Sequence, residues 1–197
     1  MRVKRQKEVK EFLVEEFGSE RGSDLFREQE TIFDTLVSNI KNKSKSQKKT
    51  LIQTILPGIA LYKALSKEDI QEEKVYAYME KYMFDKVAGK MHKSMEKMEL
   101  VPGFYAIYSR AFLKVMRGSD LHESTQERGR DYFDVTISKC LWHTACVENG
   151  CPQLCRLFCD ADNVTYGGLR KSDFRRTKTL GHGDDCCDFH FVRKGRH

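Results

Sequence analysis

The sequence predicts an α+β protein in which a helical N-terminal two-thirds packs on a small antiparallel sheet formed by the C-terminal third. Apolar residues recur at helical spacing up to residue 117. Apolar and polar residues then alternate in the segments 131–138 and 187–193, which is the period of a half-buried strand. All seven cysteines lie beyond residue 139, so the two parts also differ in their chemistry. Helices followed by strands is the order typical of the α+β class.

The helical part is expected to contain five helices. The first covers 4–17 and ends at Gly18, and the second runs from Ser23 or Asp24 to about Lys41. The basic stretch 41–49 is expected to be a solvated connection. The remaining helices are expected at 50–65, with a kink at Pro57, at 67–98, with Ser66 as N-cap, and at 103–117. For the methionines of 67–98, packing in the core is favoured over a role as the wall of a pocket.

The C-terminal part is expected to begin at Asp131, after a polar stretch from Gly118 to Arg130 that closes the helical region. A strand at 131–138 is followed by the segment 140–149, which fits neither pattern clearly. Pro152 indicates the start of a short helix that gives way to a loop at 160–168. A β-hairpin is then expected, with strands at about 175–180 and 187–193.

Length and composition favour one domain over residues 1–197. Forty per cent of the residues are hydrophobic, which is enough for a real core, and three prolines argue against a disordered chain. The net charge of +6 is modest among 64 charged residues (35 basic and 29 acidic), and no basic stripe with interleaved aromatics is visible. The sequence therefore predicts no nucleic-acid partner.

The start of the chain has no apolar run of signal-peptide length, and the most apolar stretch, 52–65, is interrupted by polar residues, proline and glycine. We therefore expect no membrane partner and a cytoplasmic location. An odd number of cysteines excludes complete disulfide pairing, so reduced thiols are expected. The Met-rich helix could also serve as a surface for a homo-oligomer.

The segment Cys159-Asp160-Ala161-Asp162 places a thiol beside two carboxylates. Carboxylates at such a position can act as a general base or ligate a metal, and a thiolate can act as a nucleophile. The alternative, that Asp160 and Asp162 are turn or cap residues, has equal weight. Cys151, Cys155 and Cys159 would share one helical stripe, for which packing is favoured over metal binding because zinc modules usually have a different spacing.

The second cluster of polar residues is Arg176-Thr177-Lys178-Thr179, with His182 and Cys187 shortly after it. Strand alternation would place Arg176 and Lys178 on one face and the threonines on the other. An arginine can bind a substrate carboxylate through two parallel hydrogen bonds, although a solvated strand face is the favoured alternative. No Walker loop, G-x-S-x-G, H-E-x-x-H or G-x-G-x-x-G motif is present, which argues against the common nucleotide-binding, hydrolase and zinc-protease classes.

Three segments together resemble the L-2-amino-thiazoline-4-carboxylic acid hydrolase family. They are ILPGIALYKAL at 55–65, CPQLCRLFCDADNVTYGGL at 151–169 and RRTKTLGHGDDCCDFHF at 175–191. The resemblance divides the chain into a helical N-terminal extension, 1–49, and a hydrolase-like core, 50–193. It implies a hydrolase that opens a cyclic amidine-like thiazoline bearing a carboxylate and yields a carbamoyl-cysteine.

For that reaction we expect Asp160 or Asp162 to activate water, with Cys159 as the alternative nucleophile. Arg176 would hold the substrate carboxylate, and Thr177, Thr179 and His182 are further candidates for substrate contacts. The C-terminal segment also resembles the vinyl-4-reductase-type small-molecule-binding domain, which implies a non-catalytic binding or sensory module as the alternative. Cysteines of that domain can hold zinc, which makes Cys159 and Cys187 candidate ligands of a divalent metal, in a site that would be incomplete because Thr177 and Thr179 stand in the first strand.

Overall fold

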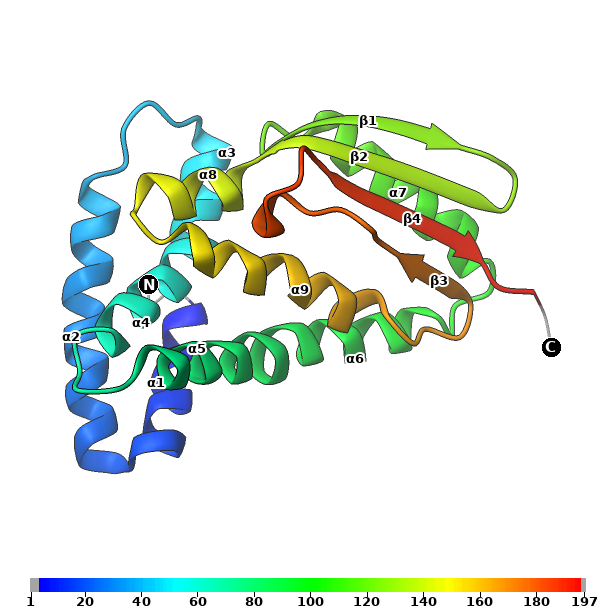
Figure 1. Ribbon diagram of the computed structural model, residues 1–197. Coiled ribbons are helices and arrows are strands. Elements are labelled where there is room, and N and C mark those ends of the chain that lie inside the picture. Colours follow the sequence, from blue (N-terminus) through cyan, green and yellow to red (C-terminus); the bar gives the residue numbers. More distant parts are fainter. Residues whose placement is uncertain (1–3, 196–197) are drawn as a thin grey trace.

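The computed structural model describes residues 4–195, in which most of the part before residue 119 consists of helices (Figure 1). They are α1 (Lys4–Phe17), α2 (Ser19–Ser38), α3 (Lys45–Thr50), α4 (Leu56–Leu65), α5 (Glu72–Lys81), α6 (Gly89–Met98) and α7 (Phe104–Gly118). Short π-helical segments join two pairs of them without a break: η1 (Leu51–Ile55) joins α3 to α4, and η2 (Tyr82–Ala88) joins α5 to α6.

The C-terminal part forms an antiparallel sheet with the strand order β1-β2-β4-β3. Its strands are β1 (His122–Arg128), β2 (Tyr132–Cys140), β3 (Ser172–Arg175) and β4 (Cys187–Arg193). Between β2 and β3 lie α8 (Leu141–Glu148), the 3₁₀ turn η3 (Pro152–Leu154) and α9 (Cys155–Tyr166), and the 3₁₀ turn η4 (Leu180–His182) precedes β4. The predicted α+β class is confirmed.

One face of the sheet is buried, as the alternation in β2 and β4 predicts. Phe133 pairs with Phe191, Val135 with Phe189, and Ile137 with Cys187. All six side chains are at most 9 % exposed and form a cluster with residues of α7. The strand positions between them are polar or half-exposed, so the opposite face is open to solvent.

Helix α9 lies between this sheet and the long helix formed by α5, η2 and α6 (Figure 1). Its apolar residues therefore contribute to two cores: Leu157 and Ala161 pack in the helical one, and Tyr166 packs against the sheet cluster. Cys159 contacts both. Since α9 is covered on two sides, its side chains that face either core are buried or half-buried, whereas Arg156 and Asn163 on the remaining face are exposed.

Helices α1 and α2, which make up most of the predicted extension, pack on α4. They cross closely at Gly22, where a Cβ atom would lie 2.5 Å from the carbonyl oxygen of Leu13. Val9, Phe12 and Leu13 of α1 are fully buried. This packing fixes the start of α1 against the rest of the protein.

Several predicted helix limits were wrong because tertiary packing and capping outweigh local pattern. Helix α2 begins at Ser19. Part of the 41–49 connection is helical, since Ser44 and Gln47 form a capping box at the start of α3. Ser66 is the C-cap of α4 rather than the N-cap of the next helix, which begins only at Glu72. The irregularity at Pro57 takes the form of η1 directly before it, since proline cannot donate the backbone hydrogen bond that an α-helix requires there.

The C-terminal third departs from prediction at four places. The polar stretch before Arg130 contains strand β1, whose half-exposed side chains give no apolar signal. The ambiguous segment 140–149 is largely helix α8. Helix α9 continues to Tyr166, so Asp160 and Asp162 are helical rather than in a loop. The first hairpin strand, expected at 175–180, lies earlier, because β3 ends at Arg175. The segment after it, which contains Thr177 and Thr179, is held by side-chain contacts.

We predict that Phe133→Ala lowers the free energy of unfolding by about 3–5 kcal/mol, because it removes a fully buried ring from the sheet core and leaves a cavity. Thr136→Ala, on the exposed face of the same strand, should cost no more than about 1 kcal/mol. Chemical denaturation of the two variants measures both values. Equal losses would contradict the assignment of one buried face.

Candidate active site

A cavity of about 300 Å³ lies between the helical layer and the buried face of the sheet. Cys159 and Asp162 of α9 line it, together with Cys140 at the end of β2 and Cys187 at the start of β4. Most of the other lining residues are apolar, among them Phe158, Met83 and Phe189. Gly58 of α4 also lines the cavity, and it leaves room for the ring of Phe158, which would be 3.3 Å from an added Cβ.

The continuation of α9 through Asp162 decides which carboxylate shares the cavity with Cys159. Residues three apart lie on the same face of a helix, so Asp162 follows Cys159 into the cavity. Asp160 lies on another face, and its carboxylate is 3.0 Å from Nε2 of His182. Of the two candidate acids, the structure therefore brings Asp162 together with Cys159.

Arg176 lies behind Asp162, and its side chain is only 2 % exposed. Its Nη1 donates to Oδ2 of Asp162 at 3.1 Å, and its Nη2 donates to the carbonyl oxygen of Cys159 at 2.6 Å. The guanidinium also lies over the ring of Phe189, at 5.5 Å from the centroid. Arg176 is not among the described residues that line the cavity, so its charge acts on Asp162 and on α9.

The pKa of Asp162 is raised to about 7, chiefly because burial disfavours the carboxylate and also because Cys159 is negatively charged nearby. Arg176 opposes this shift through its charge and its hydrogen bond. A third of the side-chain surface of Asp162 (33 %) remains accessible, and the carboxyl group borders the cavity. Asp162 can therefore both give and take a proton near neutral pH.

The pKa of the Cys159 thiol is lowered, because the thiols of Cys155 and Cys187 donate hydrogen bonds to it and favour its thiolate form. The backbone N–H of Gly181 and the charge of Arg176 act in the same direction. The pKa values of Cys155 and Cys187 are raised correspondingly. Gly181 permits the close approach of η4, since a Cβ there would lie 2.8 Å from Sγ of Cys159.

Thr177, Thr179 and His182, the other predicted substrate contacts, hold the segment that leads into β4. Oδ1 of Asp188 accepts from the backbone N–H groups of Thr177 and Lys178 at 2.9 and 2.6 Å. Oγ1 of Thr179 accepts from the backbone N–H of His182 at 3.1 Å. None of the three is among the described residues that line the cavity.

The sequence did not point to several residues of the cavity. His122 lies on the unpredicted strand β1 and stacks on Trp142 at 5.5 Å, and burial lowers its pKa. Tyr82 of η2 borders the cavity from the helical side. Arg5 of α1 reaches it from the far end of the sequence. Among these overlooked residues, Cys140 could have been identified from the sequence, because it is one of the clustered cysteines.

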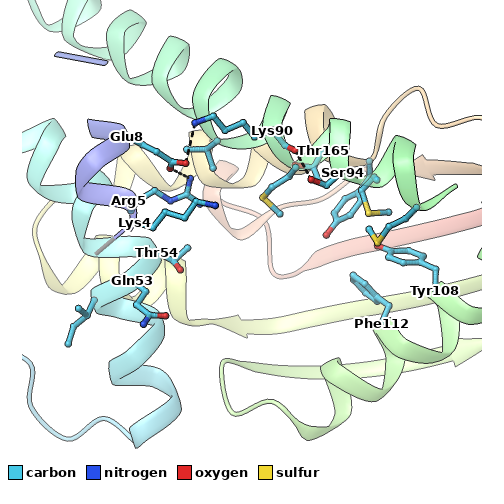
Figure 2. A pocket seen from close by; sticks show the side chains of 16 residues that line it. Lys4, Arg5, Glu8, Gln53, Thr54, Lys90, Ser94, Tyr108, Phe112 and Thr165 are labelled. Atoms are coloured by element: carbon cyan, nitrogen blue, oxygen red, sulfur yellow. Dashed lines mark hydrogen bonds and ion pairs between the residues drawn. The ribbon is translucent and has the colours of Figure 1, made fainter. Parts of the chain in front are cut away.

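A larger hollow of about 890 Å³ adjoins the cavity (Figure 2). The two share lining residues, among them Arg5, Thr54 and Tyr166. Figure 2 shows basic and acidic side chains of α1 and α6 on one side of this hollow, and the aromatic rings of Tyr108 and Phe112 on another. The hollow thus offers a route to the cavity, and the charged side chains of α1 and α6 lie along one side of this route.

The methionines of the predicted long helix divide between core and pocket. Met79 is fully buried in the helical core, whereas Met83 lines the cavity and Met91 lines both the cavity and the larger hollow. Met95 and Met98 line the outer hollow alone. The two interpretations of the Met-rich helix therefore apply to different residues of it.

The cysteines offer no evident metal centre. Cys159 and Cys187, the candidate ligands, are joined by a hydrogen bond. In residues 4–195, however, no set of three or more His, Cys, Asp or Glu side chains is arranged to hold a metal ion. We therefore assign no step to a metal.

None of the helices in the described part of the chain combines the length and the apolar composition needed to cross a bilayer.

A family model described as L-2-amino-thiazoline-4-carboxylic acid hydrolase matches residues 48–191. The matched segment contains α9, the sheet and most of the cavity wall, but not α1. Searches of curated proteins and of solved structures gave no match to the chain.

We predict that Arg176→Gln raises the pH midpoint of alkylation of Cys159 by about one unit, because it removes the cation that favours the thiolate. The measurement is the rate of iodoacetamide modification of Cys159 against pH, with the site identified by mass spectrometry. Arg175→Gln is the matched control, because that neighbouring arginine is 72 % exposed and pairs with Asp173. If both variants kept the midpoint of the unaltered protein, Arg176 would have no part in setting the charge of Cys159.

Proposed function

The chain belongs to the L-2-amino-thiazoline-4-carboxylic acid hydrolase family, and on that premise we propose that it hydrolyses a small cyclic amidine-like compound bearing a carboxylate, of which 2-amino-thiazoline-4-carboxylate is the model. The observation that carries the proposal is the pairing of Cys159 and Asp162 in one cavity. The pKa of Cys159 is lowered, which favours its thiolate, and the pKa of Asp162 is raised to about 7. Pockets for small molecules have volumes from about 300 Å³ upward, so the cavity suits a ligand of this size.

The first step is attack of the Cys159 thiolate on the ring carbon between sulfur and nitrogen. A bond forms between Sγ and this carbon, and the ring C–S bond breaks. Asp162, in its protonated form, gives its proton to the departing ring sulfur. The product of this step is an isothiourea linked to Cys159, with the carboxylate of Asp162 beside it.

Water completes the reaction. The Asp162 carboxylate takes a proton from water as the oxygen attacks the same carbon, and the bond to Sγ breaks. The remaining hydroxyl proton moves to the substrate nitrogen that was part of the ring, and the oxygen becomes the carbonyl oxygen of a carbamoyl group, so the released product is a carbamoyl-cysteine. Cys159 returns as a thiolate and Asp162 as an acid, which balances atoms and charge.

Arg176 takes a positioning role in this mechanism, since its contacts with Asp162 and with the Cys159 carbonyl fix both groups on α9. This replaces the expectation that Arg176 binds the substrate carboxylate. Asp160, which lies against His182, has no assigned step. A reducing compartment such as the cytoplasm suits the proposal, because the nucleophilic thiolate must stay reduced.

Cys159→Ser is expected to lower kcat/KM for 2-amino-thiazoline-4-carboxylate by about three orders of magnitude or more, because a serine hydroxyl stays protonated at neutral pH. Thiol release from the opened ring measures the rate. Cys186→Ser is the control, because Cys186 is not among the described residues that line the cavity, and it should keep the activity. Full activity in Cys159→Ser would exclude the nucleophilic role. Binding without turnover in the unaltered protein would favour the non-catalytic module.

The dependence of kcat/KM on pH should reveal the titration of Asp162. The lowered pKa of Cys159 favours its thiolate, so kcat/KM is expected to fall as the pH rises through about 7, where Asp162 loses the proton that it must donate. Asp162→Asn should lower kcat/KM by about 10²–10⁴-fold and remove this fall. A rate that instead rose through this pH range would mean that the carboxylate acts first as a base on water.

A further inference from the structure

Arg5 is a cation that the fold brings to the proposed catalytic cavity from outside the family-matched segment. It lines both the cavity and the outer hollow, so it stands where the two adjoin. Its side chain is 19 % exposed, and Nη1 donates to Oε2 of Glu8 at 2.9 Å (Figure 2). A guanidinium carries more N–H donors than this contact uses, in a planar array that matches a carboxylate.

Tyr82 supplies a second, independent observation. It lines the same cavity from η2 and is 1 % exposed, and its hydroxyl has no hydrogen-bond partner in the part of the chain that the structure describes. A buried hydroxyl without a partner is unfavourable and uncommon in folded proteins. A polar atom of a ligand would satisfy it. The helix that carries Arg5 also packs on Tyr82, since the ring of Phe12 in α1 lies 5.3 Å from that of Tyr82.

The distribution of charge in the cavity decides how an anionic substrate would lie. The Cys159 thiolate borders one part of it, and its negative charge would repel a substrate carboxylate there. Among the described lining residues, Arg5 is the one Lys or Arg. Arg176 cannot take this role, because its guanidinium is buried against Asp162 and the Cys159 carbonyl.

We propose that Arg5 and Tyr82 form the subsite that binds the carboxylate of the substrate and turns its ring carbon toward Cys159. This rests on the proposed function, and it makes a residue of the N-terminal helix α1 a determinant of specificity. The core matched by the family model then supplies the reacting groups, and α1 selects for the acidic substrate.

The test compares 2-amino-thiazoline-4-carboxylate with its uncharged carboxamide in steady-state kinetics. Arg5→Gln should raise KM for the carboxylate about 10- to 100-fold with little change in kcat, because it removes a charge-assisted contact made alike in the ground and transition states. Kinetics with the carboxamide should be unchanged. Tyr82→Phe, which removes only the hydroxyl, should raise KM for the carboxylate by a smaller factor.

Lys7→Gln is the matched control, because it removes a positive charge from the same helix at a side chain that is 78 % exposed and pairs with Glu11. It should leave both substrates unaffected. Equal losses on the carboxylate and the carboxamide in Arg5→Gln would show a structural role and overturn the subsite, as would unchanged kinetics on both.

Calorimetric binding separates this proposal from the hydrolase proposal. If the unaltered protein turned over neither compound, the hydrolase function would fail, and titration with the same carboxylate and carboxamide would still test Arg5. Preferential binding of the carboxylate that Arg5→Gln abolishes supports the subsite. Equal binding of the two compounds, or no binding of either, overturns it.

Discussion

The site depends on one buried cation. The guanidinium of Arg176 joins the segment after β3 to α9 through Asp162 and the carbonyl oxygen of Cys159. A guanidinium removed from water is costly unless its donors are used, and here a carboxylate, a carbonyl and an aromatic face surround it. The same contact fixes the helix turn that carries both Cys159 and Asp162, so position and charge are set together.

Thiol chemistry is organised around that turn. Cys159 receives hydrogen bonds from Cys155, one turn before it on α9, and from Cys187 at the start of β4. Each donor keeps its own proton more tightly, so the negative charge concentrates on a single sulfur. Most of the clustered cysteines thus act as packing groups and hydrogen-bond donors, and the thiolate form is favoured at Cys159.

The cavity exists because α9 separates two cores. The helical core covers one side of α9 and the sheet core covers the other, and Cys159, Asp162 and Thr165 of α9 line the space between them. Apolar walls exclude bulk water, which strengthens electrostatic interactions inside and accounts for the raised pKa of Asp162. Arg5 of α1 also lines the cavity, so the wall extends beyond the segment that the family model matches.

The sequence by itself determined the α+β class, the presence of one buried face in β2 and in β4, and the family, and it singled out the segment around Cys159, which lines the cavity. These follow from local periodicity and from residue order, which a chain carries without folding. It did not determine that Asp162 rather than Asp160 faces the cavity, because the loop expected at 160–168 is helical under tertiary packing. Nor did it show that Arg176 is buried or that Arg5 and Tyr82 meet at the cavity. Those outcomes join residues far apart in the chain, and only packing between distant segments decides which side chains share a desolvated space.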